Sequence, residues 1–224
     1  LAFNGAYHGM TQGTLAMMGN LEPKKDVHGL SPYIHFLPYP YAYRCPFGLS
    51  GEQSIDVNIE TISRLLKDPE SGIKKPAAII LEPVQGEGGV IVAPIKWLKA
   101  IRKITKELNI PLIVDEVQCG IGRTGYLYAF EKACIDPDVI VLSKALGGGL
   151  PISVIIYKKY LDNWKPGAHS GTFRGNVLAM VAGSIVLDKV NEPCFLQHVI
   201  KTGKYLQDKL NILKKEYKCV GDVR

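Results

Sequence analysis

Two apolar runs near the middle of the chain each lead into a single residue that could do chemistry. The run that begins at Ile110 ends at Asp115, and the run that begins at Val139 ends at Lys144. Uninterrupted runs of Val, Ile and Leu are typical of strands buried on both faces, as in a parallel sheet covered by helices. Ligands bind such sheets outside the carboxyl ends of the strands. The sequence therefore predicts an acid and an amine side by side at one edge of a sheet.

An aspartate that faces a lysine at such an edge is the combination that pyridoxal phosphate requires. The lysine forms a Schiff base with the aldehyde, and the aspartate keeps the pyridine nitrogen protonated so that the ring accepts electrons. A third apolar run, 77–81, ends at Glu82. Taken singly, each residue has an ordinary explanation: a strand terminus for Glu82, a helix cap for Asp115 and a solvated side chain for Lys144. Their joint occurrence at strand ends favours a cofactor site.

Nucleotide hydrolysis is the sharpest competing interpretation. The run that ends at Asp115 and Glu116 has the form of a Walker B strand, whose acid holds magnesium. Such an enzyme also needs G-x-x-x-x-G-K-[ST] to bind the phosphates. The nearest candidate, Gly203-Lys204, is followed by Tyr205 and has no glycine five positions before it. The sequence therefore argues against an ATPase.

The composition is that of a globular enzyme without a membrane segment. Hydrophobic residues make up 46% and charged residues 21% of the chain, and no apolar stretch is long enough to span a bilayer. The net charge of +6 comes from scattered lysine pairs and no nucleic-acid motif is present, so we read it mostly as solvated surface. Five cysteines without a C-x-x-C pair argue against disulfides and zinc. We expect a cytoplasmic protein that binds neither nucleic acid nor membrane.

Strand and helix patterns alternate along the chain. Helices are predicted at 11–18, 129–133, 176–190 and 193–217. Two more are predicted, one capped by Ser54 and running to Lys67, and one opened by Pro94 and running to about Leu108. Strands are predicted at 33–37, 77–81, 110–115, 139–143 and 152–157, and a Pro- and Tyr-rich loop at 38–46. This alternation predicts a doubly wound α/β domain with a mostly parallel sheet and helices on both faces. Because Leu1 is not an initiator Met, we expect an interior piece of a longer polypeptide. Residues 1–190 are then a large domain, and 191–224 lead into a truncated C-terminal small domain.

Several ordered motifs carry a resemblance to a known family. They are Tyr7-His8-Gly9, Glu82-Pro83-Val84-Gln85-Gly86-Glu87-Gly88-Gly89, Asp115-Glu116-Val117-Gln118 with Gly122-Arg123-Thr124-Gly125, Ser143 to Pro151, and Gly171-Thr172-Phe173-Arg174-Gly175-Asn176. In this order they resemble the motifs of the class III (omega-amino acid) aminotransferases, and they cover nearly the whole chain. The resemblance implies the large domain of the fold type I pyridoxal-phosphate-dependent transferases.

The resemblance implies a role for each residue around the cofactor. Lys144 would be the Schiff-base lysine and then the base that moves a proton between substrate and cofactor. Asp115 would pair with the pyridinium nitrogen and Gln118 with the phenolic oxygen of the ring. Tyr7 would stack on the ring, with His8 beside it in the cofactor-binding set.

Three further residues would serve the substrate and the assembly. Glu82 would lie near the substrate amine or the cofactor. Glu87 resembles a gate residue that pairs with an arginine in one half-reaction and releases it in the other. Thr172 would reach the phosphate of a cofactor bound mostly by the neighbouring subunit, which implies a homodimer with shared active sites.

The reaction that the resemblance implies is a ping-pong transamination. The residues of the motifs favour L-2,4-diaminobutyrate as the donor. Transfer of its 4-amino group to 2-oxoglutarate gives an aldehyde and glutamate. Ornithine, 4-aminobutyrate and acetylornithine are alternative donors. An aminomutase of the same fold is a more distant alternative, and an inactive binding module of this fold is an alternative of a different class.

Overall fold

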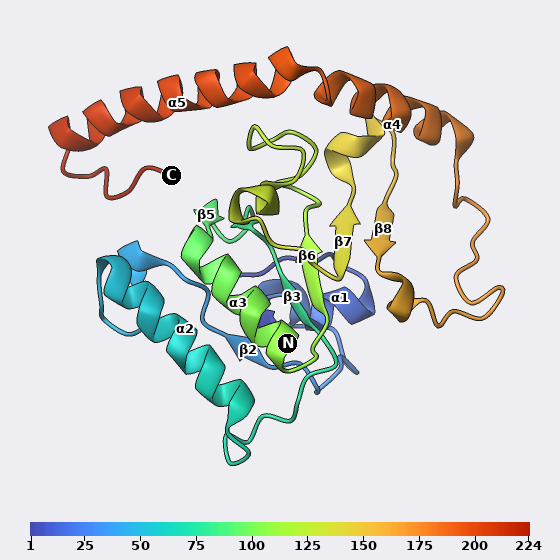
Figure 1. The fold of residues 1–224 in the computed structure, drawn as a ribbon, viewed down its shortest axis with the longest axis horizontal. Helices are drawn as coiled ribbons and strands as arrows, with labels where there is room; N and C mark the ends of the chain where they lie inside the picture. Colours follow the sequence, from blue (N-terminus) through green and yellow to red (C-terminus); the bar gives the residue numbers. More distant parts are fainter.

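The centre of the computed structural model, which describes residues 1–224, is a four-stranded sheet (Figure 1). Its strands lie in the order β3 (Ile79–Leu81), β6 (Leu112–Asp115), β7 (Val139–Leu142) and β8 (Val154–Tyr157). The first three strands run parallel, and β8 pairs antiparallel with β7. Parallel neighbours need a crossover connection, and α3 (Ile95–Glu107) lies in the connection from β3 to β6. The expected α/β fold with a mostly parallel sheet is confirmed.

Two pairs of short strands lie around this sheet. β1 (Ala2–Phe3) pairs in parallel with β2 (Phe36–Leu37), and the carbonyl before it, that of Leu1, accepts a hydrogen bond from the Ile80 N–H in β3. β4 (Val84–Gln85) and β5 (Ile91–Val92) form an antiparallel hairpin just after Glu82. The strand predicted at 33–37 is therefore shorter than expected. Its first residue, Tyr33, is 85% exposed and does not pair.

The helix α2 (Gly51–Lys67) begins earlier than predicted. Ser54 was expected to cap it, but Ser50 precedes the helix with extended backbone angles, and Ser54 lies in the first turn. The Ser54 hydroxyl donates to the Gly51 carbonyl at 2.6 Å. The prediction of a cap at Ser54 is wrong because a serine hydroxyl can also bond backwards to a carbonyl inside a helical turn.

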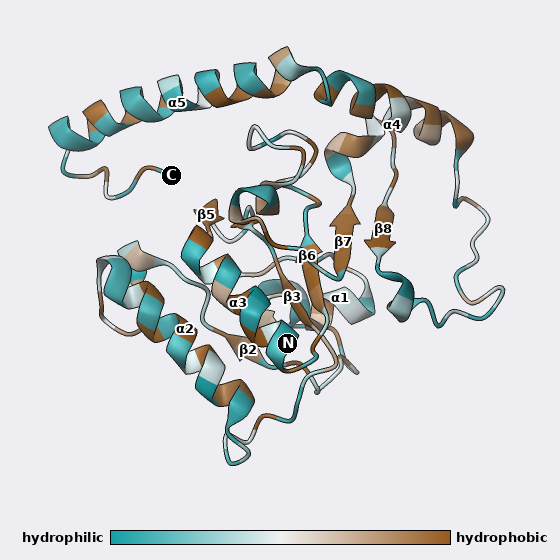
Figure 2. Cartoon of the chain, in the orientation of Figure 1, coloured by the Kyte–Doolittle hydropathy of each residue, from teal (hydrophilic) through white to brown (hydrophobic).

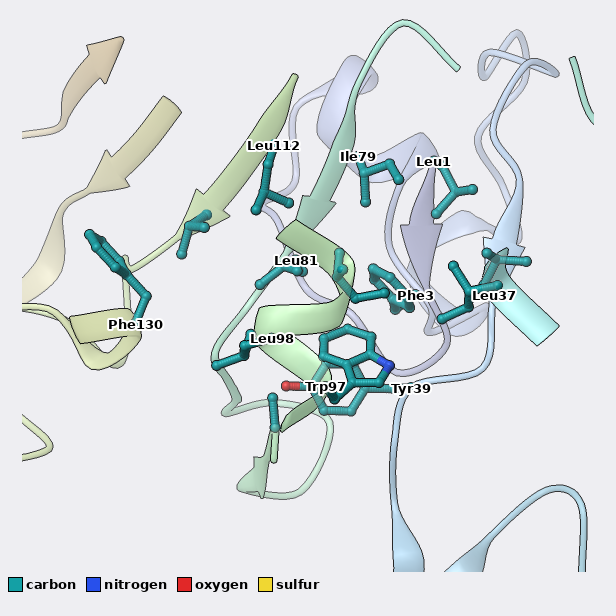
Figure 3. Packing of buried hydrophobic residues seen from close by; sticks show 14 of the residues in the cluster. Leu1, Phe3, Leu37, Tyr39, Ile79, Leu81, Trp97, Leu98, Leu112 and Phe130 are labelled. Carbon is teal, nitrogen blue, oxygen red and sulfur yellow. The ribbon is translucent and has the colours of Figure 1, made fainter. Parts of the chain in front are cut away.

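The main hydrophobic core lies between the sheet and α3. Pro94 was predicted to be the first residue of this helix and instead lies at its N-cap, one residue before it. Leu98 and Ile101 are buried on the inner face of the helix. Trp97 is fully buried, and its ring lies 5.1 Å from that of Phe3 and 5.4 Å from that of Tyr39 (Figure 3). Its Nε1 donates to Asn58 Oδ1 on α2 at 2.7 Å, so the polar edge of the indole is satisfied inside the core. This cluster fixes the two helices against the sheet.

The last two helices, α4 (Val177–Val190) and α5 (Pro193–Glu216), match the predicted ranges to within a residue. Asn176 caps α4, because its Oδ1 accepts the Ala179 N–H at 3.1 Å. α4 is apolar on nearly every side, yet Leu178 is 72% exposed (Figure 2). α5 contains no buried residue and extends past the body of the molecule (Figure 1).

The remaining elements are short. α1 (Gln12–Ala16) lies within the predicted helix at 11–18, and the predicted helix at 129–133 is a 3-10 turn, Ala129–Ala133. Further 3-10 turns span Glu22–Lys24, Ala42–Arg44, Lys144–Gly147 and Lys159–Leu161. None of the helices combines the length and the apolar character that crossing a membrane would require.

Candidate active site

The carboxyl ends of the three parallel strands meet at one edge of the sheet. Asp115 is the last residue of β6, Glu82 follows β3, and Lys144 lies two residues after the end of β7. All three line one pocket. They share it with four further residues that the sequence singled out, Tyr7, His8, Glu87 and Gln118, and with Gly9 and Val117. The structure thus brings together seven of the eight predicted site residues.

Lys144 occupies an unusual backbone conformation. Its φ of +39° lies in the left-handed region, which non-glycine residues rarely adopt. The residue before it is anchored, because the Ser143 hydroxyl donates to the Ile152 carbonyl at 2.7 Å. Lys144 is exposed and forms no ion pair with Asp115 or Glu82. The turn therefore presents an unpaired amine to the pocket, in a backbone conformation that the sequence pattern did not indicate.

Asp115 lines the pocket and is held by two hydrogen bonds. Its Oδ1 accepts the Val117 N–H at 3.0 Å, and its Oδ2 lies 2.8 Å from His8 Nδ1. The Asp115 and His8 side chains are only 8% and 1% exposed. With Nδ1 donating to the carboxylate, the other ring nitrogen, Nε2, is buried without a partner. His8 thus lines the pocket and also contacts Asp115, a contact that spacing in the sequence does not reveal.

Glu82 is a buried acid at the same edge. Its Oε1 accepts the Tyr7 N–H at 2.9 Å, and its carbonyl accepts the Tyr39 hydroxyl at 2.7 Å. Burial raises the pKa of Glu82 to about 7, with a smaller contribution from Asp115, while the Tyr7 N–H and His8 act in the opposite direction. Glu82 can therefore hold or release a proton near neutral pH. Tyr39 was assigned only to a loop, and the Pro- and Tyr-rich stretch around it was the available signal.

The raised pKa of Glu82 makes folding stability depend on pH. Between its ordinary value of 4.5 and about 7, the folded protein binds more protons here than the unfolded chain does, so this group contributes stability that falls as pH rises. We expect Glu82→Gln to remove this contribution. The free energy of unfolding of the variant should fall less steeply from pH 5 to 7, by up to about 1.4 kcal/mol per pH unit. Urea unfolding at pH 5, 6, 7 and 8 measures both slopes, and identical slopes would contradict the assignment.

Gln118 packs tightly against the glycine-rich turn that follows Glu82. A Cβ built on Gly86 would lie 1.1 Å from Gln118 Oε1, so a residue with any side chain at position 86 would displace Gln118. Gln118 Nε2 donates to Glu87 Oε1 at 3.2 Å, and the Oε1 atom of Gln118 is buried without a partner. The glycine is therefore needed for close approach. Gln118 also links the two segments that carry Glu87 and Asp115.

Thr172 is the one predicted site residue that lies elsewhere. It is exposed, in the segment between β8 and α4, and does not line the pocket of Lys144. The role expected for it depends on a neighbouring subunit and stays a prediction. No group of three or more His, Cys, Asp and Glu side chains is arranged to hold a metal ion.

The pocket offers groups that suit a pyridine aldehyde. Lys144 supplies an unpaired amine, Asp115 a buried acid for a ring nitrogen, and Tyr7 an aromatic ring. The orphaned Gln118 Oε1 and His8 Nε2 are buried polar atoms that have no partner within the chain. The residues present thus fit the cofactor expected from the sequence.

Comparisons with known proteins agree on one family and one fold. The family profile described as aminotransferase class-III matches residues 1–224. The diaminobutyrate–2-oxoglutarate aminotransferase of Rhizobium meliloti (strain 1021) is 56% identical over 100% of this chain and 48% of its own length. A protein of the same name from Haemophilus influenzae is 49% identical over 100% of this chain and 49% of its own length. The chain thus spans about half the length of the curated relatives it matches.

Solved structures give the same result. An amine transaminase from an uncultivated Pseudomonas species, in its PLP-bound form, matches with a TM-score of 0.90 and 29% identity, over 100% of this chain and 52% of its own. The ornithine aminotransferase of Toxoplasma gondii matches with a TM-score of 0.79 and 28% identity, over 93% of this chain and 44% of its own.

Proposed function

The chain belongs to the class III aminotransferase family, and we propose that it forms the cofactor-binding core of a pyridoxal-phosphate-dependent transaminase. One observation supports this most directly: Asp115 and Lys144 follow neighbouring parallel strands and line the same pocket. The names of the relatives and the PLP-bound neighbour agree with it. When bound, pyridoxal phosphate supplies an aldehyde that condenses with amines and a protonated ring that accepts electrons.

Lys144 and Asp115 carry the central roles. Lys144 Nζ would hold the cofactor through its aldehyde and, when its amine is free, would move a proton to or from the substrate carbon. Its lack of an ion pair leaves the amine available for both tasks. The Asp115 carboxylate would accept a hydrogen bond from the ring nitrogen and so would hold a proton there. The hydrogen bond from His8 keeps that carboxylate in one orientation.

The other pocket residues bind and orient. Tyr7 and Gln118 line the pocket; Tyr7 would stack its ring on the pyridine, and Gln118 would hydrogen-bond the phenolic oxygen. The pKa of Glu82 is about 7, so this side chain would pair with the cationic substrate amine when it is ionised and would release that amine when it is protonated. In this structure Glu87 accepts a hydrogen bond from Gln118. We propose that Glu87 pairs with an arginine while the cationic amine of the donor is bound, and that it releases the arginine when the second carboxylate of 2-oxoglutarate must bind.

The substrates and the assembly are parts of the same proposal. The donor is the 4-amino group of L-2,4-diaminobutyrate and the acceptor is 2-oxoglutarate, in line with the names of the relatives. Ornithine, 4-aminobutyrate and acetylornithine are the rival donors. We further propose a cytoplasmic homodimer in which Thr172 reaches the partner's cofactor phosphate. In this proposal residues 1–190 form the cofactor-binding domain and 191–224 lead into a small domain.

Reductive labelling tests the covalent role of Lys144. This chain, and one extended to the length of its relatives, are incubated with pyridoxal phosphate, reduced with borohydride and digested, and the peptide that gains the cofactor mass is mapped. We expect the label on Lys144. A label only in the longer chain shows that further segments complete the site, whereas no label in either would exclude a transaminase.

A further inference from the structure

Glu116 is a buried acid for which the proposed reaction has no use. It follows Asp115 directly, but the two side chains have different partners. Asp115 lines the pocket, whereas the Glu116 carboxylate is 1% exposed and pairs with no cation. Its Oε1 accepts the Phe130 N–H and its Oε2 the Ala129 N–H, each at 3.0 Å, and Cys119 Sγ lies 3.3 Å from Oε2. Glu116 therefore satisfies the first two N–H groups of the 3-10 turn Ala129–Ala133.

These contacts close a loop at both ends. The segment 117–128 leaves the strand at Val117 and Gln118, which line the pocket, and returns at Ala129. At its start, Val117 is fixed by Asp115 Oδ1; at its end, Ala129 is fixed by the Glu116 carboxylate. The loop that carries Gln118 is thus hydrogen-bonded at its start to Asp115 and at its end to Glu116.

The main chain of Glu116 connects the same point to the strand that leads to Lys144. Its N–H donates to the Val141 carbonyl in β7 at 2.9 Å, and its carbonyl accepts the Gly120 N–H at 2.9 Å. A Cβ on Gly120 would lie 2.7 Å from that carbonyl oxygen and 2.9 Å from the Glu116 Cβ. Glycine at position 120 therefore allows the loop to pack closely against Glu116.

Burying the ionised Glu116 carboxylate is unfavourable, because the charged form loses its hydration. Burial raises the pKa of Glu116 to about 7, although the Ala129 and Phe130 N–H groups and Cys119 act in the opposite direction. A glutamine would fit the space, but its NH₂ group would face one of the two N–H donors. Only a carboxylate offers an acceptor oxygen to each. The arrangement therefore places a specific demand on this side chain.

We propose that Glu116 is a positioning residue, which fixes loop 117–128 and through it the orientation of Asp115 and Gln118 relative to Lys144. This inference rests on the proposed function, because it assigns Glu116 to the site that binds the cofactor. Glu116 touches neither cofactor nor substrate in this proposal. It acts through the two residues that do.

The test compares Glu116→Gln and Glu116→Ala with a matched control in a chain extended to the length of its relatives. Glu131→Gln is the control, because Glu131 lies in the same turn and accepts the Tyr128 N–H but is exposed. Amide hydrogen exchange at Ala129 and Phe130 is measured without cofactor, and the Kd of pyridoxal phosphate is determined. At saturating cofactor, kcat, KM and the visible absorption of the lysine-bound cofactor are then measured.

We expect Glu116→Gln to lose exchange protection at one of the two amides and to raise the Kd about 10-fold, as losses of supporting residues around bound groups commonly do. At saturation, kcat and the pH dependence of the absorption should shift while KM changes little. Glu116→Ala should go further, and Glu131→Gln should match the wild type. Lost protection with unchanged Kd, kcat and absorption would mean that Glu116 only stabilises the fold, and this result would refute the proposal. A wild type that binds no cofactor overturns the proposed function and this role with it.

Discussion

Replacing Lys144 by alanine is expected to lower kcat for transamination by about 10⁴-fold or more in a protein that still folds. Lys144 supplies the only amine among the residues that line the pocket, so its loss removes both the covalent attachment and the proton carrier. The amine has no ion pair to lose, and the residue is exposed. Alanine and lysine share a Cβ, so the strain of the positive φ is the same in both.

The measurement pairs turnover with stability. kcat is determined with 2-oxoglutarate and L-2,4-diaminobutyrate, and Tm is measured for the same samples. Lys103→Ala serves as the control, since Lys103 is 79% exposed on α3, remote from the pocket. The control should retain wild-type kcat. A Lys144→Ala variant within tenfold of the wild-type kcat would refute the role of this lysine.

The strands that position the site were predictable because their signal is local. The apolar runs that end at Asp115 and Lys144 became β6 and β7, and both residues reached the expected edge. Burial on both faces demands such runs, so the pattern survives in the sequence. The start of α2 was missed because both Ser50 and Ser54 suit a helix N-terminus, and the Ser54 hydroxyl instead donates to the Gly51 carbonyl inside the first turn.

The partners of the site residues were not predictable in the same way. His8 and Asp115 are 107 positions apart, and nothing in either segment indicates that one donates to the other. The pairing of Gln118 with Glu87 likewise depends on how two loops meet at Gly86. Glu116 looked like part of a motif, and its role emerges only from the two N–H groups that it accepts. Residue types at strand ends could be predicted, whereas contacts across the fold required the structure.

Replacing Asp115 by asparagine is expected to lower kcat by about 10²- to 10³-fold, because it removes the charge beside the ring nitrogen and leaves the side-chain shape. The carbonyl oxygen of the new side-chain amide could still accept the Val117 N–H, so the turn should keep its conformation. The amide cannot hold a proton on the ring nitrogen as a carboxylate does. Asp136→Asn is the control, since Asp136 is 70% exposed and does not line the pocket.

His8 allows this effect to be traced to the carboxylate itself. If His8 acts only by orienting Asp115, His8→Phe alone should lower kcat less than Asp115→Asn does. Adding His8→Phe to Asp115→Asn should then change kcat little further, because residues that act as a unit are not additive. The four proteins of this cycle are compared in kcat at saturating cofactor. Fully additive losses would show that His8 contributes independently of Asp115, and the 2.8 Å contact between them would then not be the route by which it acts.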